Sequence, residues 1–378
     1  MKTLLATYII AASVLVPTTC ALSASPEQPQ SSPTLKWNQI AMDTIERIKP
    51  TQHQAIRLLA YVSLAQYAAL ADAQDKTAIP DVVATASTRV LAELAPAQAA
   101  FVEERLRQSG TRETEKGLAV ARNVLTQARS DNFARPFSGQ VPQEQHLWRS
   151  LANPPAPPAY PAIGAMRTFA LESGSVFRLP PPPTLESARF QRDLAEIKRH
   201  AESPTAESTR LAKFYDMTTG TLAAGFWNSQ AAERISANKL SELQGARILA
   251  TMNTAMMDAV VACHDTKYIY WVPRPSQADP AIKPLIGVPN HPAYPSNHSC
   301  ISTVAALVLA HFFPQDRSRL ETIATEAGLS RIYAGLHYRF DVDAGEEIGR
   351  KVAAVVVARH QDMLARWTQT LLAQSAIP

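Results

Sequence analysis

The sequence is poor in cysteine and glycine, and apolar runs long enough to span a membrane do not recur along it. Only 3 cysteines and 13 glycines occur among 378 residues. Three cysteines are too few for a small disulfide-stabilised scaffold. The lack of recurring apolar runs of about 20 residues excludes a polytopic membrane protein. With 46% hydrophobic and 19% charged residues, the composition is globular and excludes an intrinsically disordered chain.

A strong charge of one sign is also missing. The 37 basic and 33 acidic residues are interspersed, and no long block of lysine or arginine stands out. The net charge of +4 therefore gives little support for a nucleic-acid or membrane-surface partner. We expect small-molecule substrates, no nucleic-acid partner and no stable membrane insertion of the mature protein, and we leave a homo-oligomer open.

The first residues have the composition of a secretory signal peptide. Lys2 precedes the apolar run LLATYIIAASVLV, and Pro17 and a stretch of small residues follow it. An uncleaved anchor helix is disfavoured because the run is shorter than the ~20 residues that a span needs. We predict a signal peptide over residues 1–24, a disordered leader over residues 25–36, and a secreted or periplasmic protein.

Helical patterns fill most of the remaining chain. Apolar residues recur at three- and four-residue spacing in many segments, whereas alternating strand patterns and Asn-Gly or Asp-Gly hairpin signals are missing. We predict an all-α fold, a bundle of roughly ten or more helices forming a single domain over residues 37–378. The Pro-rich segment 151–184 cannot be helical throughout. Because it contains Phe169 and Phe177, we expect a loop packed across the helices rather than a free linker.

Three short motifs in the part 241–370 combine cations, histidines and a helix start. They read KYIYWVPRP, YPSNHS and SRIYAGLHYRFD, and the second leads directly into the helical pattern CISTVAALVLAHFF. Their chemistry-bearing residues are Lys267, Arg274, Ser296, Asn297, His298, Arg331, His337 and Asp341. We therefore expect the active-site half of the protein in this part of the chain.

These residue types point to chemistry on an oxyanion. Three cations exceed what one carboxylate requires and suit an anion with several charged oxygens, such as phosphate or vanadate. Ser296 at a helix N-terminus adds an anion-binding position. Of the two histidines, one can bond to the central atom while the other moves protons. Asp341 lies four residues after His337, where it could hold the imidazole tautomer.

The three motifs resemble the signature of the type 2 phosphatidic acid phosphatase and vanadium-dependent haloperoxidase superfamily, K-x6-R-P, P-S-G-H and S-R-x5-H-x3-D. Nearly every position matches in order and spacing, and from about Trp37 onward the chain looks like the soluble bacterial haloperoxidase-type members. The resemblance implies an all-α haloperoxidase/acid-phosphatase-like fold. It also implies two chemistries for one pocket, halide oxidation by peroxide on histidine-bound vanadate or phosphoester hydrolysis through a phosphohistidine.

Carried onto this sequence, the resemblance gives each motif residue a role. The oxyanion ligands are Lys267, Arg274, Ser296, Asn297 and Arg331. The acid–base histidine is His298, and His337 bonds vanadium or becomes phosphorylated, with Asp341 behind it. Asn297 stands where the family has Gly, so its side chain either crowds the pocket or adds a hydrogen bond. Vanadate is the implied cofactor of a haloperoxidase, and a phosphatase needs none.

Three further residues are candidates for the pocket. His291 lies seven residues before His298, where a histidine resembles the bromide-using haloperoxidases, although an ordinary loop histidine fits equally well. His264 is either a pocket wall or a helix-end residue. Asp258 lies in the apolar run AMMDAVVA, and because a buried carboxylate needs a partner, it either orients a catalytic side chain or makes an interhelical hydrogen bond.

The two cysteines downstream of the signal segment, Cys263 and Cys300, flank the first two motifs. Since those motifs must converge on one ion, we expect both cysteines within one small region. They form either a disulfide or two small buried residues.

The pocket residues do not separate the two chemistries, but the overall length and the full-length resemblance put a vanadium-dependent haloperoxidase slightly ahead of an acid-phosphatase-type hydrolase. In either case we expect an exported enzyme. A third hypothesis, an oxyanion-binding protein without turnover, is disfavoured because simple binding does not require both His298 and His337.

Overall fold

The computed structural model describes residues 32–71 and 75–374, and every regular element within these ranges is helical. The all-α prediction is therefore confirmed. The predicted signal peptide, residues 1–24, and most of the predicted leader lie outside the described residues. The α-helices are α1 (Pro33–Ile48), α2 (Gln52–Ala71), α3 (Ile79–Leu94), α4 (Ala99–Gln108), α5 (Glu115–Arg129), α6 (Ala188–Glu202), α7 (Ala206–Phe214), α8 (Leu222–Ala237), α9 (Glu242–Tyr270), α10 (Pro275–Ala278), α11 (Asn297–Phe312), α12 (Arg317–Tyr333) and α13 (Arg339–Gln374).

Helix α1 begins earlier than the sequence pattern suggested. The predicted leader extended to residue 36, but the helix starts at Pro33. Ser32 caps it by accepting a hydrogen bond from the Leu35 N–H at 3.2 Å, and proline is favoured at the first helical position because its missing N–H has no intrahelical partner there. The cap and the proline, rather than the apolar period, set this boundary.

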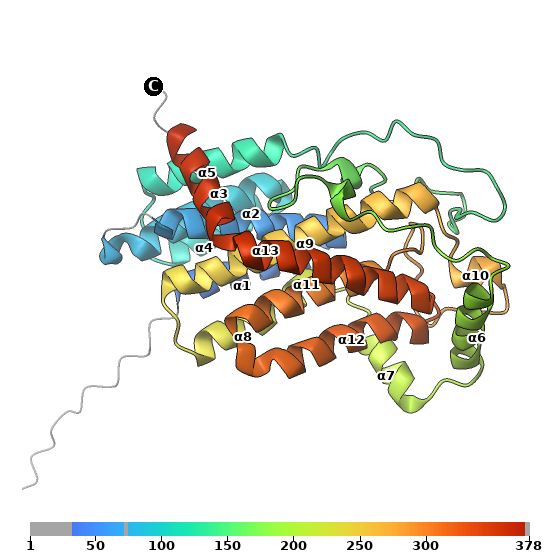
Figure 1. The fold of residues 1–378 in the computed structure, drawn as a ribbon. Helices are drawn as coiled ribbons and strands as arrows, with labels where there is room; N and C mark the ends of the chain where they lie inside the picture. The colour runs from blue at the N-terminus through green and yellow to red at the C-terminus, as the bar shows by residue number, and fades with distance from the viewer. Residues whose placement is uncertain (1–31, 72–74, 375–378) are drawn as a thin grey trace, which may run out of the picture. The chain divides into compact units, whose positions relative to one another are not determined.

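Helix α9 forms the centre of the bundle (Figure 1). It begins with a capping box between Ser241 and Gln244, and nearly all its residues from Gly245 to Lys267 are buried. A helix that is apolar on all sides must be covered on all sides, and α2, α11 and α13 pack around it.

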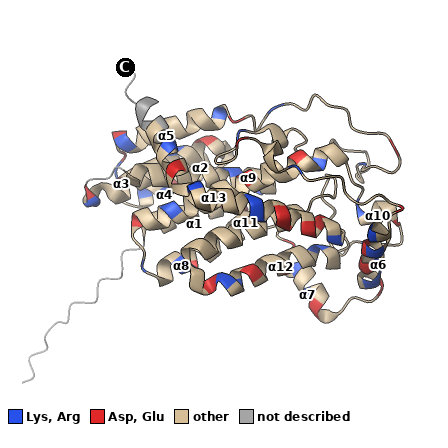
Figure 2. Ribbon diagram, in the orientation of Figure 1, with Lys and Arg blue, Asp and Glu red and all other residues tan. Residues whose placement is uncertain are grey.

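Helices α11 and α13 approach each other closely beside this central helix. Helix α11 contains no Lys, Arg, Asp or Glu and is uniformly tan in Figure 2. A Cβ on Gly345 of α13 would lie 2.5 Å from the Ser296 carbonyl oxygen and 2.7 Å from the Ser299 Cβ. Only glycine permits this approach, which brings the first turn of α13 against the start of α11.

The Pro-rich segment 151–184 packs against the helices. It contains no α-helix, yet Phe169 is buried and Phe177 is half-buried against the core. A Cβ on Gly164 would lie 2.7 Å from the Asp265 Cα of α9, so the backbones of loop and helix are in contact. The segment is a packed loop, as its aromatic residues indicated.

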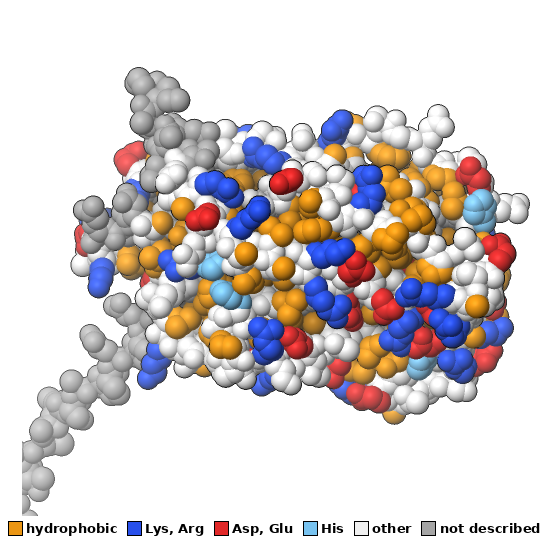
Figure 3. All heavy atoms as spheres, viewed as in Figure 1, with side chains coloured by type: hydrophobic (Ala, Val, Ile, Leu, Met, Phe, Trp, Pro, Cys, Tyr) orange, Lys and Arg blue, Asp and Glu red, His pale blue; other side chains and the backbone are white. Residues whose placement is uncertain are grey.

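Ion pairs hold the outer helix α6 against the elements that carry the motifs. Lys198 pairs with Asp279 at 3.2 Å, Arg189 pairs with Asp343 at 3.1 Å, and Glu196 pairs with Arg339. On the face shown in Figure 3, acidic and basic side chains are mixed, including at the end where α6 lies. Among the described helices, none has both the length and the hydrophobicity needed to cross a membrane.

Candidate active site

The motif residues meet because each lies at the end of a helix. Lys267 is in the last turn of α9, Arg274 caps α10, and Arg331 is in the last turn of α12. Ser296 caps α11, whose first two residues are Asn297 and His298. His337 lies in the turn between α12 and α13, and Asp341 is in the first turn of α13. Five helices, α9 to α13, therefore contribute their ends to one site.

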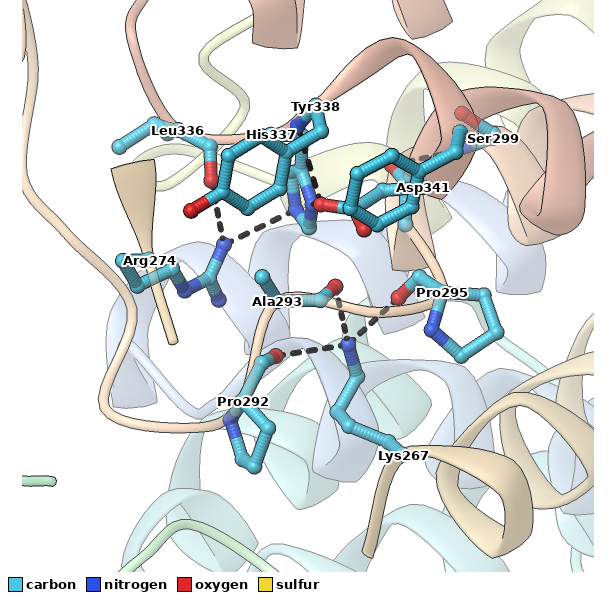
Figure 4. Close-up of polar contacts among 12 residues, drawn as sticks. Lys267, Arg274, Pro292, Ala293, Pro295, Ser299, Leu336, His337, Tyr338 and Asp341 are labelled. Atoms are coloured by element: carbon cyan, nitrogen blue, oxygen red, sulfur yellow. Dashed lines mark hydrogen bonds and ion pairs between the residues drawn. The ribbon is translucent and has the colours of Figure 1, made fainter. Parts of the chain in front are cut away.

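His337 keeps an unprotonated ring nitrogen at this site. Its Nδ1 is 2.9 Å from Asp341 Oδ2 and its Nε2 is 3.0 Å from Arg274 Nη1 (Figure 4). Because a guanidinium has only donors, Nε2 must be the acceptor and Nδ1 must carry the proton. The tautomer is thus fixed with the nucleophilic nitrogen at Nε2, although His337 precedes α13 rather than lying on a helical face with Asp341.

Asp341 is fully buried, and its carboxylate is used asymmetrically. Oδ2 accepts hydrogen bonds from the His337 ring and from the Tyr338 N–H at 3.0 Å, whereas Oδ1 is buried without a partner. Burial raises the pKa of Asp341 to about 7, although the charges of Lys267 and Arg274 oppose this rise. The carboxylate therefore titrates near neutral pH.

Arg274 links His291 to His337. Its Nη1 also donates to the Leu336 carbonyl at 3.0 Å, its Nε donates to the His291 carbonyl at 3.0 Å, and its Nη2 lies 3.1 Å from His291 Nδ1. Burial lowers the pKa of Arg274 to about 10, and Asp341 counteracts this effect. The guanidinium remains charged and holds both rings.

Lys267 organises the loop before α11. Its three ammonium protons are donated to the carbonyls of Pro292 at 2.8 Å, Ala293 at 2.9 Å and Pro295 (Figure 4). Burial lowers the pKa of this lysine to about 8. Lys267 was predicted as an oxyanion ligand, but in this structure its protons are engaged by the loop, and it contributes a buried positive charge behind the site.

Arg331 and His298 are held by the segment between α7 and α8. Arg331 Nη2 donates to the carbonyls of Tyr215 at 2.7 Å and Ala212 at 3.2 Å, and its Nη1 is 4.0 Å from Asp216 Oδ1. His298 Nε2 lies 3.2 Å from the Asp216 carbonyl, which can only accept, so Nε2 carries the proton. Burial lowers the pKa of His298 to about 3, and Arg331 adds to this effect.

These side chains surround a cavity of about 260 Å³. Of the sequence-predicted residues, the cavity wall contains His291, Asn297, His298, Arg331 and His337. Lys267, Arg274 and Ser296 are fully buried behind this wall. The cavity therefore has His298 and His337 on its surface and the Arg331 guanidinium beside them. The positive charges of Lys267 and Arg274 lie behind the wall.

Part of the cavity comes from segments that the motifs do not mark. His53 of α2, Ala159 of the Pro-rich loop, and the residues 216–218, 222 and 223 also line it. The motif-bearing part 241–370 thus forms only one side of the cavity. No local sequence signal marks the other side, because its residues come together only when α2 and α8 pack against α9 and α11.

His264 belongs to a hydrogen-bonded group beside the cavity. Its Nε2 lies 2.8 Å from His53 Nε2 and 2.8 Å from Asn297 Nδ2. Burial lowers the pKa of His53 to about 3 and that of His264 well below its usual value, and Lys267 adds to both shifts. Both rings are therefore neutral, and within the described residues no group of His, Cys, Asp and Glu is arranged to hold a metal ion.

Asp258 is not part of the cavity wall. Its Oδ1 accepts the N–H of Phe169 at 2.7 Å, and its Oδ2 accepts those of Ala170 at 2.7 Å and Leu171 at 3.2 Å. Burial raises its pKa to about 6, while the three N–H groups oppose this rise. The expectations of a pocket residue and of an interhelical bond were both wrong, since the loop's unpaired backbone N–H groups supply the partners.

Cys263 and Cys300 lie together behind the loop, as the motif spacing required. Both are buried free thiols in hydrogen-bond contact with each other, and Cys263 Sγ also contacts the Pro295 carbonyl at 3.7 Å. Burial raises the pKa of Cys300 well above its usual value, so this thiol is protonated and unreactive.

Part of the chain is similar in sequence to known proteins. Residues 248–364 match the PAP2 superfamily. A non-specific acid phosphatase of Salmonella typhi is 28% identical over 216 residues, covering 54% of this chain and 82% of that protein. A non-specific acid phosphatase of Providencia stuartii is 27% identical over 188 residues, covering 48% of this chain and 73% of that protein.

Solved structures share the fold over most of the chain. A bacterial vanadium-dependent iodoperoxidase superposes with a TM-score of 0.74 at 21% identity, covering 86% of this chain and 96% of that chain. A bacterial vanadium-dependent chloroperoxidase in its apo form superposes with a TM-score of 0.71 at 14% identity, covering 83% and 95%. At these identities the likeness establishes the architecture.

Proposed function

We propose that this chain, whose residues 248–364 match the PAP2 superfamily as the motifs indicated, is an oxyanion-dependent histidine enzyme of the vanadium haloperoxidase type. The observation that carries the proposal is the fixed tautomer of His337. Asp341 and Arg274 hold its ring with Nε2 unprotonated, accepting from Arg274, and His337 lines a cavity that Arg331 and the start of α11 also line. That arrangement suits a ligand or nucleophile aimed at an electrophilic centre.

The donor set around the cavity fits vanadate. His337 Nε2 would bond the metal, Arg331 would face its oxygens, and the N-terminal turn of α11 would direct N–H groups at them, since the first N–H groups of a helix lack intrahelical acceptors. Bound vanadate would supply the centre at which hydrogen peroxide is activated to oxidise a halide. The protein's part is to bind, orient and neutralise spread negative charge.

His298 is the proposed proton carrier. It lines the same cavity as His337, and in this structure its Nε2–H is donated to the Asp216 carbonyl. Its low pKa leaves it neutral, but an oxyanion bound beside it would raise that pKa because opposite charges favour the protonated form. His298 would then exchange a proton with the oxygen leaving or entering the centre.

The extent of the shared fold supports the haloperoxidase reading. This chain covers 96% of the iodoperoxidase structure and 95% of the chloroperoxidase structure. The small cavity also suits peroxide and a halide, and His291 on its wall supplies the histidine that resembles the bromide-using members.

A second candidate function, phosphoester hydrolysis, is favoured by sequence. The curated relatives at 27–28% identity are named acid phosphatases. In this reaction His337 Nε2 would attack phosphorus, the ester P–O bond would break, and His298 would pass a proton to the leaving oxygen. Water would then release phosphate from the histidine.

One paired assay separates these reactions. The purified protein is supplied with vanadate, hydrogen peroxide and bromide or iodide, and in parallel with a generic phosphomonoester without vanadate. Vanadate-dependent halide oxidation supports the first candidate, and hydrolysis that vanadate inhibits supports the second. If neither reaction occurs and His298→Ala binds phosphate as tightly as the wild type, the chain is an oxyanion-binding protein and both enzymatic proposals fail.

Export remains part of the proposal. The segment over residues 1–24 supports a secreted or periplasmic enzyme. Expression of the full chain with its N-terminus intact, followed by fractionation and N-terminal sequencing, tests it. Recovery of the uncleaved chain in the cytoplasmic fraction would contradict export.

A further inference from the structure

Asn297 lies on the cavity wall, and its side-chain amide is hydrogen-bonded to a buried histidine behind that wall. It is the first residue of α11 and lies on the cavity wall with its neighbour His298. Its Nδ2 is 2.8 Å from His264 Nε2, and that nitrogen is in turn 2.8 Å from His53 Nε2. The three residues come from α11, α9 and α2, and all are buried.

This bridge holds in either orientation of the amide. If His264 Nε2 carries the lone pair, it accepts from the Asn297 amide and from the His53 ring. If it carries the proton, the amide turned over accepts with Oδ1, and His53 Nε2 can share the same proton. Burial keeps both rings neutral, so no titration near neutral pH releases the amide.

We propose that Asn297 is a specificity-determining residue that limits the size of the group attached to the oxyanion. In this proposal His264, itself hydrogen-bonded to His53, holds the Asn297 side chain in place. The inference rests on the proposed function, in that the cavity binds a tetrahedral oxyanion against His337. It adds which substrates fit there, namely those with a small substituent.

The geometry explains why a side chain at this position restricts the cavity. The cavity measures about 260 Å³, below the ~300–1,000 Å³ common for small-molecule sites. Asn297 lies on the wall beside His298 and His337. The side chain cannot swing aside without breaking its buried hydrogen bond to His264 Nε2, which is unfavourable.

Direct binding of stable oxyanions tests the limit without requiring turnover. Methyl-, phenyl- and naphthylphosphonate carry the same charged group with substituents of increasing size, and calorimetry gives the dissociation constant of each. We expect the wild type to bind methylphosphonate far better than naphthylphosphonate. Asn297→Gly should reduce the ratio of the two dissociation constants by about tenfold or more, since pockets discriminate by roughly 10–200-fold per methylene.

The role of the bridge needs its own variants. His264→Leu leaves Asn297 in the sequence but removes its hydrogen-bond partner. The ratio of the dissociation constants of naphthyl- and methylphosphonate should therefore also fall, by a smaller factor than in Asn297→Gly. His264→Gln provides an amide that can bond Asn297 again, and we expect it to restore most of the wild-type ratio. A purely structural role of His264 would weaken all three phosphonates alike and would leave the ratio unchanged.

Asn290 offers a matched control on the same cavity. Its amide bonds the Pro157 carbonyl at 2.6 Å and the Ser150 hydroxyl at 3.0 Å, so Asn290→Gly should leave the ratio as in the wild type. An unchanged ratio in Asn297→Gly, or an equal fall in Asn290→Gly, would overturn the size limit alone. If the wild type binds no phosphonate, the oxyanion site itself is wrong, and the size limit is overturned with it.

Discussion

Replacing Asp341 by Asn tests how the orientation of His337 is maintained. The carboxylate Oδ2 accepts from His337 Nδ1 at 2.9 Å and from the Tyr338 N–H at 3.0 Å. In Asp341→Asn, the amide oxygen can occupy the Oδ2 position and accept both hydrogen bonds. The opposite placement would bring the amide NH2 against the Tyr338 N–H, so the backbone donor selects the first placement.

The expected loss follows from this selection. Since the His337 tautomer is preserved, the loss does not exceed the whole contribution of one hydrogen bond to a charged group, about 1.5–3 kcal/mol. At 1.36 kcal/mol per tenfold, kcat should fall by no more than about 10- to 150-fold. Reversal of the tautomer would cost far more, about 10⁴-fold in a Ser-His-Asp triad.

The pH dependence provides an independent readout. Burial raises the pKa of Asp341 to about 7, and the carboxylate form is needed, so wild-type kcat/KM should fall as the pH decreases through 7. Asn does not titrate, so the fall of kcat/KM on the acid side should be lost in Asp341→Asn. A fall caused by protonation of the substrate would remain in both proteins.

Two further measurements make the result decisive. Nitrogen NMR of protein with labelled histidine reports whether His337 carries its proton on Nδ1 in the variant. Asp343→Asn is the matched control, because Asp343 is on the same helix but is half-exposed and pairs with Arg189. Full activity in Asp341→Asn, or an unchanged fall of its kcat/KM at acid pH, would refute the role of the carboxylate. A loss near 10⁴-fold with the proton on His337 Nε2 would refute the idea that the Tyr338 N–H selects the orientation of the amide.

The site and the fold support three further predictions. His337→Ala should abolish turnover in whichever reaction the paired assay detects, since His337 supplies the bonding nitrogen, and full activity would refute the assignment. Burial lowers the pKa of Lys267 to about 8, so phosphate affinity measured by calorimetry should fall as the pH rises through 8 and the ammonium loses its charge. Lys267→Arg should move that fall to higher pH, and an unmoved limb would assign it to another group. Gly345→Ala should lower the free energy of unfolding by about 1–3 kcal/mol in chemical denaturation, because its methyl would overlap the Ser296 carbonyl. Gly287→Ala is the control and should not destabilise the protein, because no atom lies within 4 Å of the added carbon. Equal stabilities of the two variants would refute the close packing.

The sequence predicted the chemistry of the site better than its boundaries. Spacing alone related His337 to Asp341 and the two cysteines to each other, because residues a few positions apart or flanking convergent motifs have little freedom to separate. The apolar period likewise predicted the helices, although the start of α1 depended on Ser32 and Pro33, which carry a capping signal outside the apolar pattern.

The sequence by itself determined the all-α class, the oxyanion chemistry and the motif residues, because helix period and motif spacing are local properties. Tertiary structure decided which residues face the cavity. It turned Lys267 toward the carbonyls of the loop before α11, and it turned Asp258 toward the backbone of the Pro-rich loop. It also brought His53 from α2 to the cavity and against His264. These contacts join residues 25, 89 and 211 positions apart, and they depend on how apolar helices pack, which no local pattern records.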